Sequence, residues 1–385
     1  HCAYGALQRQ SSVDHDYITD GFLATSIEHE LEARQSTVRV LEQITDVTAT
    51  ITAAAEAAGE DDRARHLAIE ASRKQLLKTC EQSHPGHRCS IAAFDAGSVY
   101  RQMRYLELRD IRLVYAPPAA IGEFGGDIDN WMWPRHPGDF SIVRAYVGPD
   151  GQPADFAKEN RPYQPDTWLK ISHEGVAPGD FVAVLGYPGH TDRHLSLPEV
   201  KRQVSQVLPA RVDLYGEWIE ILTALGDADP VVAIKVAAKK KSLANRHKNA
   251  QGMLAGIQRM QLLKKKEQLD TQLRAWVAKP ANQAHADVLE KLMRHSHDVA
   301  TSHDRALLLG HISRGPNLLA TAVDLVRRAR AQKLPDLERD MAYMDRSAHK
   351  LRGKLLRRVR NFDPKVDSEL LASLIVRAGQ LPKGQ

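Results

Sequence analysis

The hydrophobic pattern of this chain changes its period near residue 192, and that change limits the folds open to it. Before this point, short β-branched or aromatic runs alternate with glycine, proline and aspartate, as the turns of a barrel or sandwich require. After it, apolar residues alternate with charged and amide residues at a period near 3.6, which is typical of helices. We therefore expect a strand-rich domain over 1–192 and a helical domain over 193–385.

The strand signals are five runs, and a single helix interrupts them. The runs cover 37–45, 89–94, 111–117, 140–148 and 180–188, and the helix covers about 50–81. Strands in the first half and helices in the second predict a β + α protein, in one large or two smaller domains for a chain of 385 residues.

Composition and charge exclude few classes of protein. The formal net charge is +5 and the isoelectric point is near 9.0. The lysine runs at 237–249 and 262–268 lie on predicted helices without aromatic residues that would stack on bases. We interpret them as solvated helix faces and expect no nucleic-acid partner. No apolar run approaches the roughly 18 residues that a membrane-spanning helix needs, so we expect no membrane span.

The three cysteines leave several pairings open. Cys80 and Cys89 frame a ten-residue stretch whose Pro-Gly turn could bring the two sulfurs within bridging distance. An oxidising compartment would favour a disulfide. Unpaired thiols are one alternative. A zinc site with His84 and His87 is another, although its spacing is too tight for an ordinary zinc finger. Cys2 is either free or paired with sequence outside residues 1–385.

Metal-dependent hydrolysis fails the motif tests. The stretch EHELEAR at 28–34 begins like a zincin helix, but Ala33 stands where the second histidine is needed. DIDN at 127–130 begins like a calcium loop, but tryptophan and methionine follow it. Ser313 lacks the glycine and the preceding strand of a nucleophile elbow, so we do not assign it as a nucleophile. We expect no metal and no other cofactor.

Serine-protease chemistry fits the remaining motifs. In that chemistry a histidine takes the proton from the nucleophilic serine, and a buried aspartate orients the histidine. His-Cys is a recurrent dipeptide around the histidine, and the chain begins with His1-Cys2, followed by a plausible helical turn. Asp139 stands at the start of the alternating run GDFSIVRAYV. The sequence therefore nominates His1 as the general base and Asp139 as the orienting carboxylate.

Three longer motifs identify a family. They are HCAYGALQ, RDIRLVYAPPAAIGEFGGDIDNWMWPRHPGDFSIVRAYVGPDG and GYPGHTDRH. With them the chain resembles the bacterial dipeptidyl-peptidase VII and XI family of serine exopeptidases along essentially its whole length. The resemblance implies a partial chymotrypsin-like double β-barrel with a large inserted α-helical cap domain. It also implies release of dipeptides from the free N-terminus of peptides, without a metal.

The resemblance also implies the roles of four residues. His1 and Asp139 match the base and the orienting carboxylate, while Asn130 and Trp131 match the pair that holds and surrounds the substrate's N-terminal ammonium. That amine, with a pKa of about 7.7–8, is mostly protonated at neutral pH. An oxygen aimed at it forms a charge-assisted hydrogen bond of roughly 1.5–3 kcal/mol. We interpret Asp127 as a turn residue without a chemical role.

The serine itself has no glycine-rich strand–turn context within 1–385. We therefore interpret the chain as an inactive fragment, with the serine, a second ammonium ligand and the specificity residue after 385 and a secretory leader before His1. The resemblance implies a periplasmic or secreted location and a homodimer acting on peptides with a free N-terminus. A non-catalytic peptide-binding relative is the alternative function, and a basic helical nucleic-acid binder is the least favoured.

Overall fold

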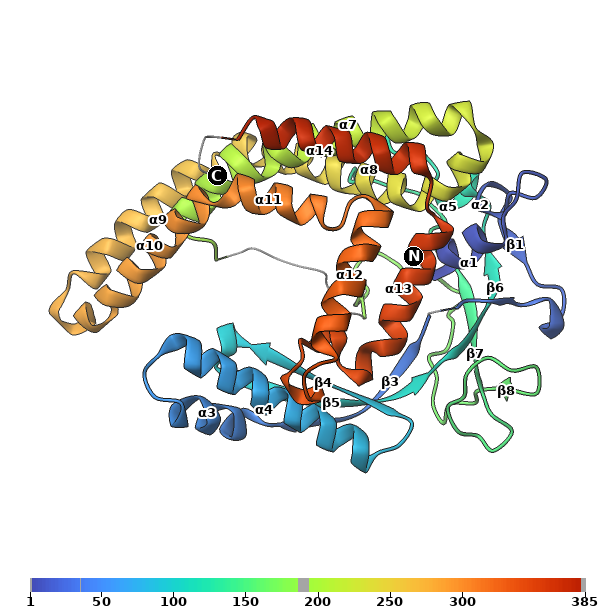
Figure 1. The fold of residues 1–385 in the computed structure, drawn as a ribbon, viewed down its shortest axis with the longest axis horizontal. Coiled ribbons are helices and arrows are strands. Elements are labelled where there is room, and N and C mark those ends of the chain that lie inside the picture. Colours follow the sequence, from blue (N-terminus) through green and yellow to red (C-terminus); the bar gives the residue numbers. More distant parts are fainter. Residues whose placement is uncertain (1, 35, 186–193, 382–385) are drawn as a thin grey trace. The chain divides into compact units, whose positions relative to one another are not determined.

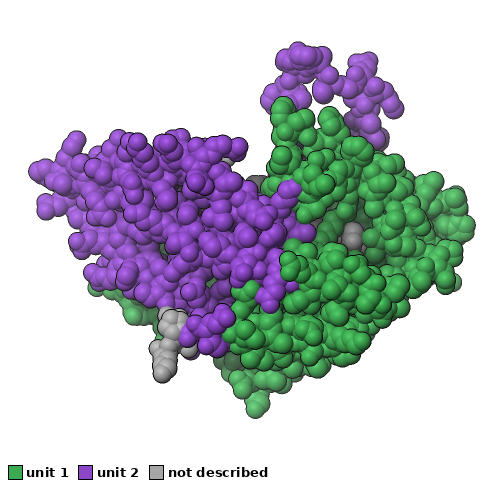
Figure 2. Space-filling view, turned by 90° about the horizontal axis from the view of Figure 1, so that it is seen from above, with its two compact units in different colours: residues 1–163, 218–242, 309–377 green, residues 164–217, 243–308, 378–385 purple. Residues whose placement is uncertain are grey.

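The computed structural model describes residues 2–34, 36–185 and 194–381 and has a mixed β and α fold with a half-barrel of strands (Figure 1). The chain divides into two compact units (Figure 2). Unit 1 comprises 1–163, 218–242 and 309–377, and unit 2 comprises 164–217, 243–308 and 378–385. Every strand in the described ranges lies in unit 1. The domain boundary at 192 stays a prediction.

Two antiparallel sheets form the half-barrel. The larger sheet has the order β1 (Phe22–Leu23), β6 (Asp110–Ala116), β7 (Ile142–Val147) and β8 (Arg161–Pro162), and β2 (Leu31–Glu32) also pairs with β6. The smaller sheet has the order β3 (Val38–Asp46), β5 (Val99–Leu108) and β4 (His87–Phe94). Strand β6 therefore pairs on one edge with two short strands and on the other with β7.

Four of the five predicted strands are confirmed, as β3, β4, β6 and β7. The prediction of a strand over 180–188 is wrong for 180–185, which form no strand, while 186–188 lie outside the described residues. A strand is stable only when its backbone is paired, and no strand in the described ranges pairs with this segment. Its Phe181 and Val184 side chains are almost fully exposed.

The helix predicted over 50–81 is two helices, α3 (Thr48–Ala57) and α4 (Asp62–Ser83). Gly59 adopts a φ of +82°, which ends α3, and the Asp61 carboxylate accepts a hydrogen bond from the Ala64 amide at 2.7 Å as the N-cap of α4. Ile51 of α3 and Leu77 of α4 pack in one hydrophobic cluster with residues of β4 and β5. The two helices thus cover one face of the smaller sheet (Figure 1).

The second half of the chain is helical, as predicted. The helices are α6 (Leu197–Arg202), α7 (Leu208–Ala228), α8 (Pro230–Arg259), α9 (Leu262–Val277), α10 (Ala286–Thr301), α11 (His303–Ile312), α12 (Asn317–Ala331), α13 (Ala348–Arg360) and α14 (Pro364–Gly379). None of the helices in the described ranges combines the length and apolar character that crossing a membrane requires.

The interpretation of the first lysine run as a solvated face is wrong for Lys239, whereas Lys241 is exposed. The Lys239 ammonium donates a hydrogen bond to the Gly315 carbonyl at 2.7 Å, and burial lowers the pKa of Lys239. Lys241 forms an ion pair with Glu123. The long aliphatic stem of lysine can cross apolar surface and still deliver its charge to a buried acceptor, so the lysine run alone did not predict the contacts.

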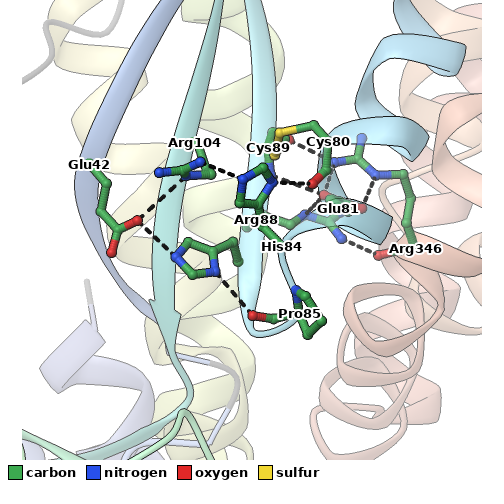
Figure 3. Close-up of a disulfide and its surroundings, with 10 residues drawn as sticks. Glu42, Cys80, Glu81, His84, Pro85, Arg88, Cys89, Arg104 and Arg346 are labelled. Atoms are coloured by element: carbon green, nitrogen blue, oxygen red, sulfur yellow. Dashed lines mark hydrogen bonds and ion pairs between the residues drawn. A yellow bond between two sulfur atoms is a disulfide. The ribbon is translucent and has the colours of Figure 1, made fainter.

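The cysteine stretch forms a disulfide between Cys80 of α4 and Cys89 of β4, with Cα atoms 6.3 Å apart (Figure 3). This pairing confirms one of the three alternatives and removes the two sulfurs that a zinc site would need. Both half-cystines are buried. Arg346 lies beside the disulfide, where its guanidinium donates to both Glu81 carboxylate oxygens at 2.6 and 3.1 Å and to the Cys89 carbonyl at 2.7 Å.

The larger sheet buries a charged network at its centre. Arg112 donates to the Asp110 carboxylate at 2.7 and 3.0 Å and lies over the Tyr146 ring at 3.8 Å from its centroid. The Tyr146 hydroxyl donates to Glu30 at 2.7 Å, and Arg144 donates to the other oxygen of the same carboxylate at 2.8 Å. Burial and the hydrogen bond to Glu30 raise the pKa of Tyr146 to about 12.

Replacing both half-cystines, as Cys80→Ala/Cys89→Ala, should lower the free energy of unfolding by about 2–3 kcal/mol, because the short loop is no longer closed in the unfolded chain. Urea unfolding followed by circular dichroism measures the loss. Reductant should destabilise the wild-type protein and leave the double variant unchanged; equal sensitivity of both proteins would contradict a stabilising disulfide.

Tyr146→Phe should lower the free energy of unfolding by about 2 kcal/mol at pH 8, because a buried carboxylate loses a hydrogen-bond donor. The fold stabilises the protonated phenol, so this contribution is complete below pH 10 and is lost as the pH rises toward about 12. The stability difference between wild type and variant should therefore shrink over that interval. Tyr163→Phe, at the edge of the neighbouring hydrophobic cluster, is the matched control, and a difference that stays constant to pH 12 would contradict the assignment.

Candidate active site

Three of the four predicted site residues lie on one loop of unit 1. The loop covers 123–141 and joins α5 (Ala119–Gly122) to β7. It carries Asn130, Trp131 and Asp139, and it contains no strand and no helix. The geometry of the site therefore depends on what holds an irregular backbone in place.

The first half of the 123–141 loop is a series of tight turns. The Gly126 amide donates to the Glu123 carbonyl at 2.6 Å, and the Asp129 amide donates to the Gly125 carbonyl at 3.1 Å. Gly125 has a φ of +77°, and a Cβ there would collide with the Asp129 side chain, so only glycine fits. The half-buried Asn130 donates from its side-chain amide to the Asp127 carboxylate at 3.4 Å, a turn contact that agrees with the role expected of Asp127.

Trp131 has a strained backbone. Its φ is +60°, in the left-handed region that bulky residues rarely occupy. Such conformations cost on the order of 1–3 kcal/mol and persist where the surroundings impose them, which occurs frequently at binding sites. The Trp131 side chain is 58% exposed, so a large aromatic surface next to Asn130 faces solvent.

The end of the 123–141 loop is held by α5. The Gly138 amide donates to the Ile121 carbonyl at 2.8 Å, and a Cβ on Gly138 would lie 2.7 Å from the Ile121 side chain. Asp139 follows directly, and the next ring, Phe140, packs against Tyr115 of β6 with centroids 5.7 Å apart. Asp139 is exposed and precedes β7 by three residues. The expectation that Asp139 starts the strand is wrong, because the backbone before Ile142 is used to reach α5.

His1 lies outside the described residues, so its pairing with Asp139 stays a prediction. The helix that follows it, α1 (Cys2–Gln10), confirms the expected helical turn. Ala6 and Leu7 of α1 are buried against Leu108, Ile111 and other residues of β5 and β6. Helix α1 is thus packed on the same sheet that leads into the 123–141 loop.

Two motifs outside the loop were also considered in the sequence. No group of three or more His, Cys, Asp or Glu side chains among residues 2–34, 36–185 and 194–381 is arranged to hold a metal ion. The Ser313 hydroxyl donates to the Gly310 carbonyl at 3.2 Å at the end of α11, in agreement with the decision not to assign it as a nucleophile.

Two contacts of these segments were not predicted from the sequence. Glu123 forms an ion pair with Lys241 of α8, and Gln8 of α1 donates to the Ile234 carbonyl of the same helix at 2.7 Å. The glutamine of the HCAYGALQ motif was the available signal for the contact between Gln8 and Ile234. No pattern in the sequence indicated the ion pair between Glu123 and Lys241.

Comparisons with known proteins agree with this description. The family model described as Peptidase S46 matches residues 1–384. An Asp/Glu-specific dipeptidyl-peptidase of Shewanella putrefaciens is 36% identical over 96% of this chain and 50% of its own length. Dipeptidyl-peptidase 7 of Porphyromonas gingivalis is 35% identical over 76% of this chain and 41% of its own length. The chain spans about half the length of the curated relatives it matches.

The fold is also similar to that of a solved structure. The crystal structure of Porphyromonas endodontalis DPP11 in complex with the dipeptide Arg-Glu superposes with a TM-score of 0.79 and 30% sequence identity. The match covers 99% of this chain and 55% of that one. The mixed β and α architecture with its half-barrel is therefore an architecture that a dipeptidyl-peptidase uses.

Proposed function

The chain belongs to the peptidase S46 family, and from this premise we propose that it is the part of a serine dipeptidyl-peptidase that carries the base, the orienting carboxylate and the ammonium-binding loop. Its relatives are named as dipeptidyl-peptidases. The observation that carries the proposal is the 123–141 loop, which places Asn130, Trp131 and Asp139 on one backbone that turns and α5 hold in place.

In the proposed reaction, His1 takes the proton from a serine that attacks the second peptide carbonyl of the substrate. The imidazolium gives this proton to the leaving amine as the C–N bond breaks, and water then hydrolyses the acyl-enzyme to release the dipeptide. Asp139 keeps the imidazole in the required tautomer and stabilises the imidazolium that forms. We place the serine in polypeptide outside residues 1–385. A chymotrypsin-like double barrel with an inserted helical cap is the architecture we propose for the whole enzyme.

Asn130 sets the distance between the substrate N-terminus and the bond that is cut. A dipeptidyl-peptidase must measure two residues from a charged amine, and the side-chain oxygen of Asn130 accepts a hydrogen bond from that ammonium. Trp131 next to it excludes water, which strengthens the contact because the local dielectric constant falls. The left-handed backbone at Trp131 supports a functional rather than a purely structural reason for this conformation.

The disulfide supports the proposed location. Structural disulfides persist in oxidising compartments, and the Cys80–Cys89 pair is buried in unit 1. We propose that the full-length enzyme acts in the periplasm or outside the cell, as a homodimer, on peptides with a free N-terminus. The Asp/Glu-specific and dipeptidyl-peptidase 7 relatives are similarly identical to this chain, so acidic and apolar residues before the scissile bond are both candidates.

Asp139→Asn in the full-length enzyme should lower kcat by roughly three to four orders of magnitude, because an amide holds the imidazole in the wrong tautomer. Release of a fluorophore from dipeptides with acidic or apolar second residues measures the effect. Asp150→Asn, in the exposed turn after β7, is the matched control. Activity of Asp139→Asn within tenfold of wild type would remove Asp139 from the mechanism.

Blocking the substrate amine should abolish turnover. An N-acetylated dipeptide loses the ammonium and leaves the oxygen of Asn130 without its charged partner, which should lower kcat/KM by at least about 100-fold. The comparison is made with the free and acetylated forms of the same fluorogenic dipeptide. Similar rates for both forms would show that Asn130 does not recognise the substrate ammonium. Binding of the free peptide without any turnover would favour the non-catalytic peptide-binding alternative.

A further inference from the structure

Helix α8 touches both segments that carry the proposed catalytic residues. The Gln8 side-chain amide of α1 donates to the carbonyl oxygens of Ile234 and Lys235 at 2.7 and 3.3 Å. Lys241 of α8 pairs with Glu123 at the start of the 123–141 loop. All of these residues lie in unit 1, to which α8 belongs up to residue 242.

Both contacts are made by the same face of α8. Residues 234 and 241 are seven positions apart, which is nearly two full helical turns, so they share a face and are separated by about 10 Å along the axis. A continuous hydrogen-bonded helix of this length is stiff. Helix α1 and the 123–141 loop, which contact α8 at these two positions, are therefore held at a fixed distance from each other.

The first contact fixes α1. Gln8 is 5% exposed, and a buried amide without a partner would cost about 1–3 kcal/mol, so the contact to α8 is strongly preferred. The neighbouring Ala6 and Leu7 are packed on the larger sheet. Helix α1 is thus clamped between the sheet and α8, and it begins at the residue after His1.

The second contact joins the 123–141 loop to α8 through an ion pair whose two side chains are each 44% exposed. The Glu123 carboxylate meets Lys241, while the Glu123 carbonyl accepts the hydrogen bond that opens the turns leading to Asn130. Two residues earlier, the Ile121 carbonyl accepts from Gly138, the neighbour of Asp139. The contacts that tie the two ends of the loop therefore lie two residues apart, at Ile121 and Glu123.

We propose that Gln8 and the Glu123–Lys241 ion pair are positioning residues that use α8 as a spacer between the general base and the loop that carries its carboxylate. This inference rests on the proposed function. Neither contact reaches the reacting atoms. Gln8 acts on the His1 segment alone, whereas the ion pair acts on Asp139 and also on the ammonium ligand Asn130.

The two contacts should be separable by kinetics of the full-length enzyme. Gln8→Leu should lower kcat about tenfold with KM unchanged, because only the base is displaced. Lys241→Met should lower kcat by a similar factor and also raise KM several-fold, because the ammonium ligand moves as well. In both variants the acid limb of the kcat/KM profile should shift to lower pH, since an imidazolium less well supported by Asp139 is a stronger acid.

Matched controls come from the same helices. Gln10→Leu on α1 and Lys240→Met on α8 change the same residue types at neighbouring positions and should leave kcat, KM and the pH profile unchanged. If Gln8→Leu does not fold, Gln8→Asn tests the same contact, because it keeps the amide and shortens the side chain by one methylene. The charge-exchanged Glu123→Lys/Lys241→Glu variant should recover most of the activity that Lys241→Met loses.

Three results would contradict the inference or its premise. If the Gln8 and Lys241 variants match their controls while Asp139→Asn remains strongly impaired, the spacer role of α8 is wrong and the proposed function stands. If Asp139→Asn is active, Asp139 is removed from the mechanism, and with it the premise of this inference. Failure of the charge-exchanged pair to recover activity, with a melting temperature equal to that of wild type, removes the ion pair from the positioning role.

Discussion

The pairing of β6 with three other strands is the constraint on which unit 1 depends. This strand binds β1 and β2 along one edge and β7 along the other, and its Ile111 and Leu113 form the cluster that receives α1. Its last residues lead through Pro117 and Pro118 into α5 and the 123–141 loop. A shift in the register of β6 would move α1 and the loop together.

The start of the same strand explains why this register is well defined. Asp110 and Arg112 are fully or almost fully buried, and they satisfy each other within the strand rather than across the sheet. Slipping β6 by one residue would turn both charges to the opposite face, away from Tyr146 and from Asn160, which donates to Asp110 at 3.0 Å. The slip would keep the Asp110–Arg112 pair but remove these other partners, and a buried polar group that loses a partner costs about 1–3 kcal/mol, so the network opposes any alternative pairing.

Most of the fold could be predicted from periodicity, because four strands and the helical half depend on local alternation of apolar residues. Strand β5 could not, since its sequence VYRQMRYLEL carries charges on the sheet. These charges are matched by cross-strand partners: Glu107 accepts from Arg39 at 2.9 Å, and Arg104 lies 3.5 Å from Glu42. Such a strand looks polar until its partner is known. The run at 180–185 failed for the opposite reason, because it is a continuous apolar run without a partner strand in the described ranges.

The candidate site likewise has a part that could be predicted from the sequence and a part that could not. The resemblance to the dipeptidyl-peptidase family was sufficient to nominate Asn130, Trp131 and Asp139, because all three lie within one long motif of that family. One residue that contacts the loop, Lys241, is more than a hundred positions away from its partner Glu123, on a helix whose lysines resemble an ordinary solvated face. Contacts of this kind arise from tertiary packing, and a single sequence contains no local signal for them.

The loop combines rigidity with exposed apolar surface, and this combination suits recognition of a charged chain end. Turn hydrogen bonds and α5 fix the backbone on both sides of Asn130, while Ile128, Trp131 and Trp133 present 58–92% of their surface to solvent. A bound peptide terminus would cover those side chains and displace water from around the ammonium. A charge-assisted hydrogen bond strengthens as water leaves and weakens steeply with misalignment. A preformed loop therefore gains more binding free energy from this burial than a loop that must first be ordered. By the same reasoning, the contacts of Glu123 and Gly138 are as important to the proposed recognition as the Asn130 side chain that we propose to bind the amine.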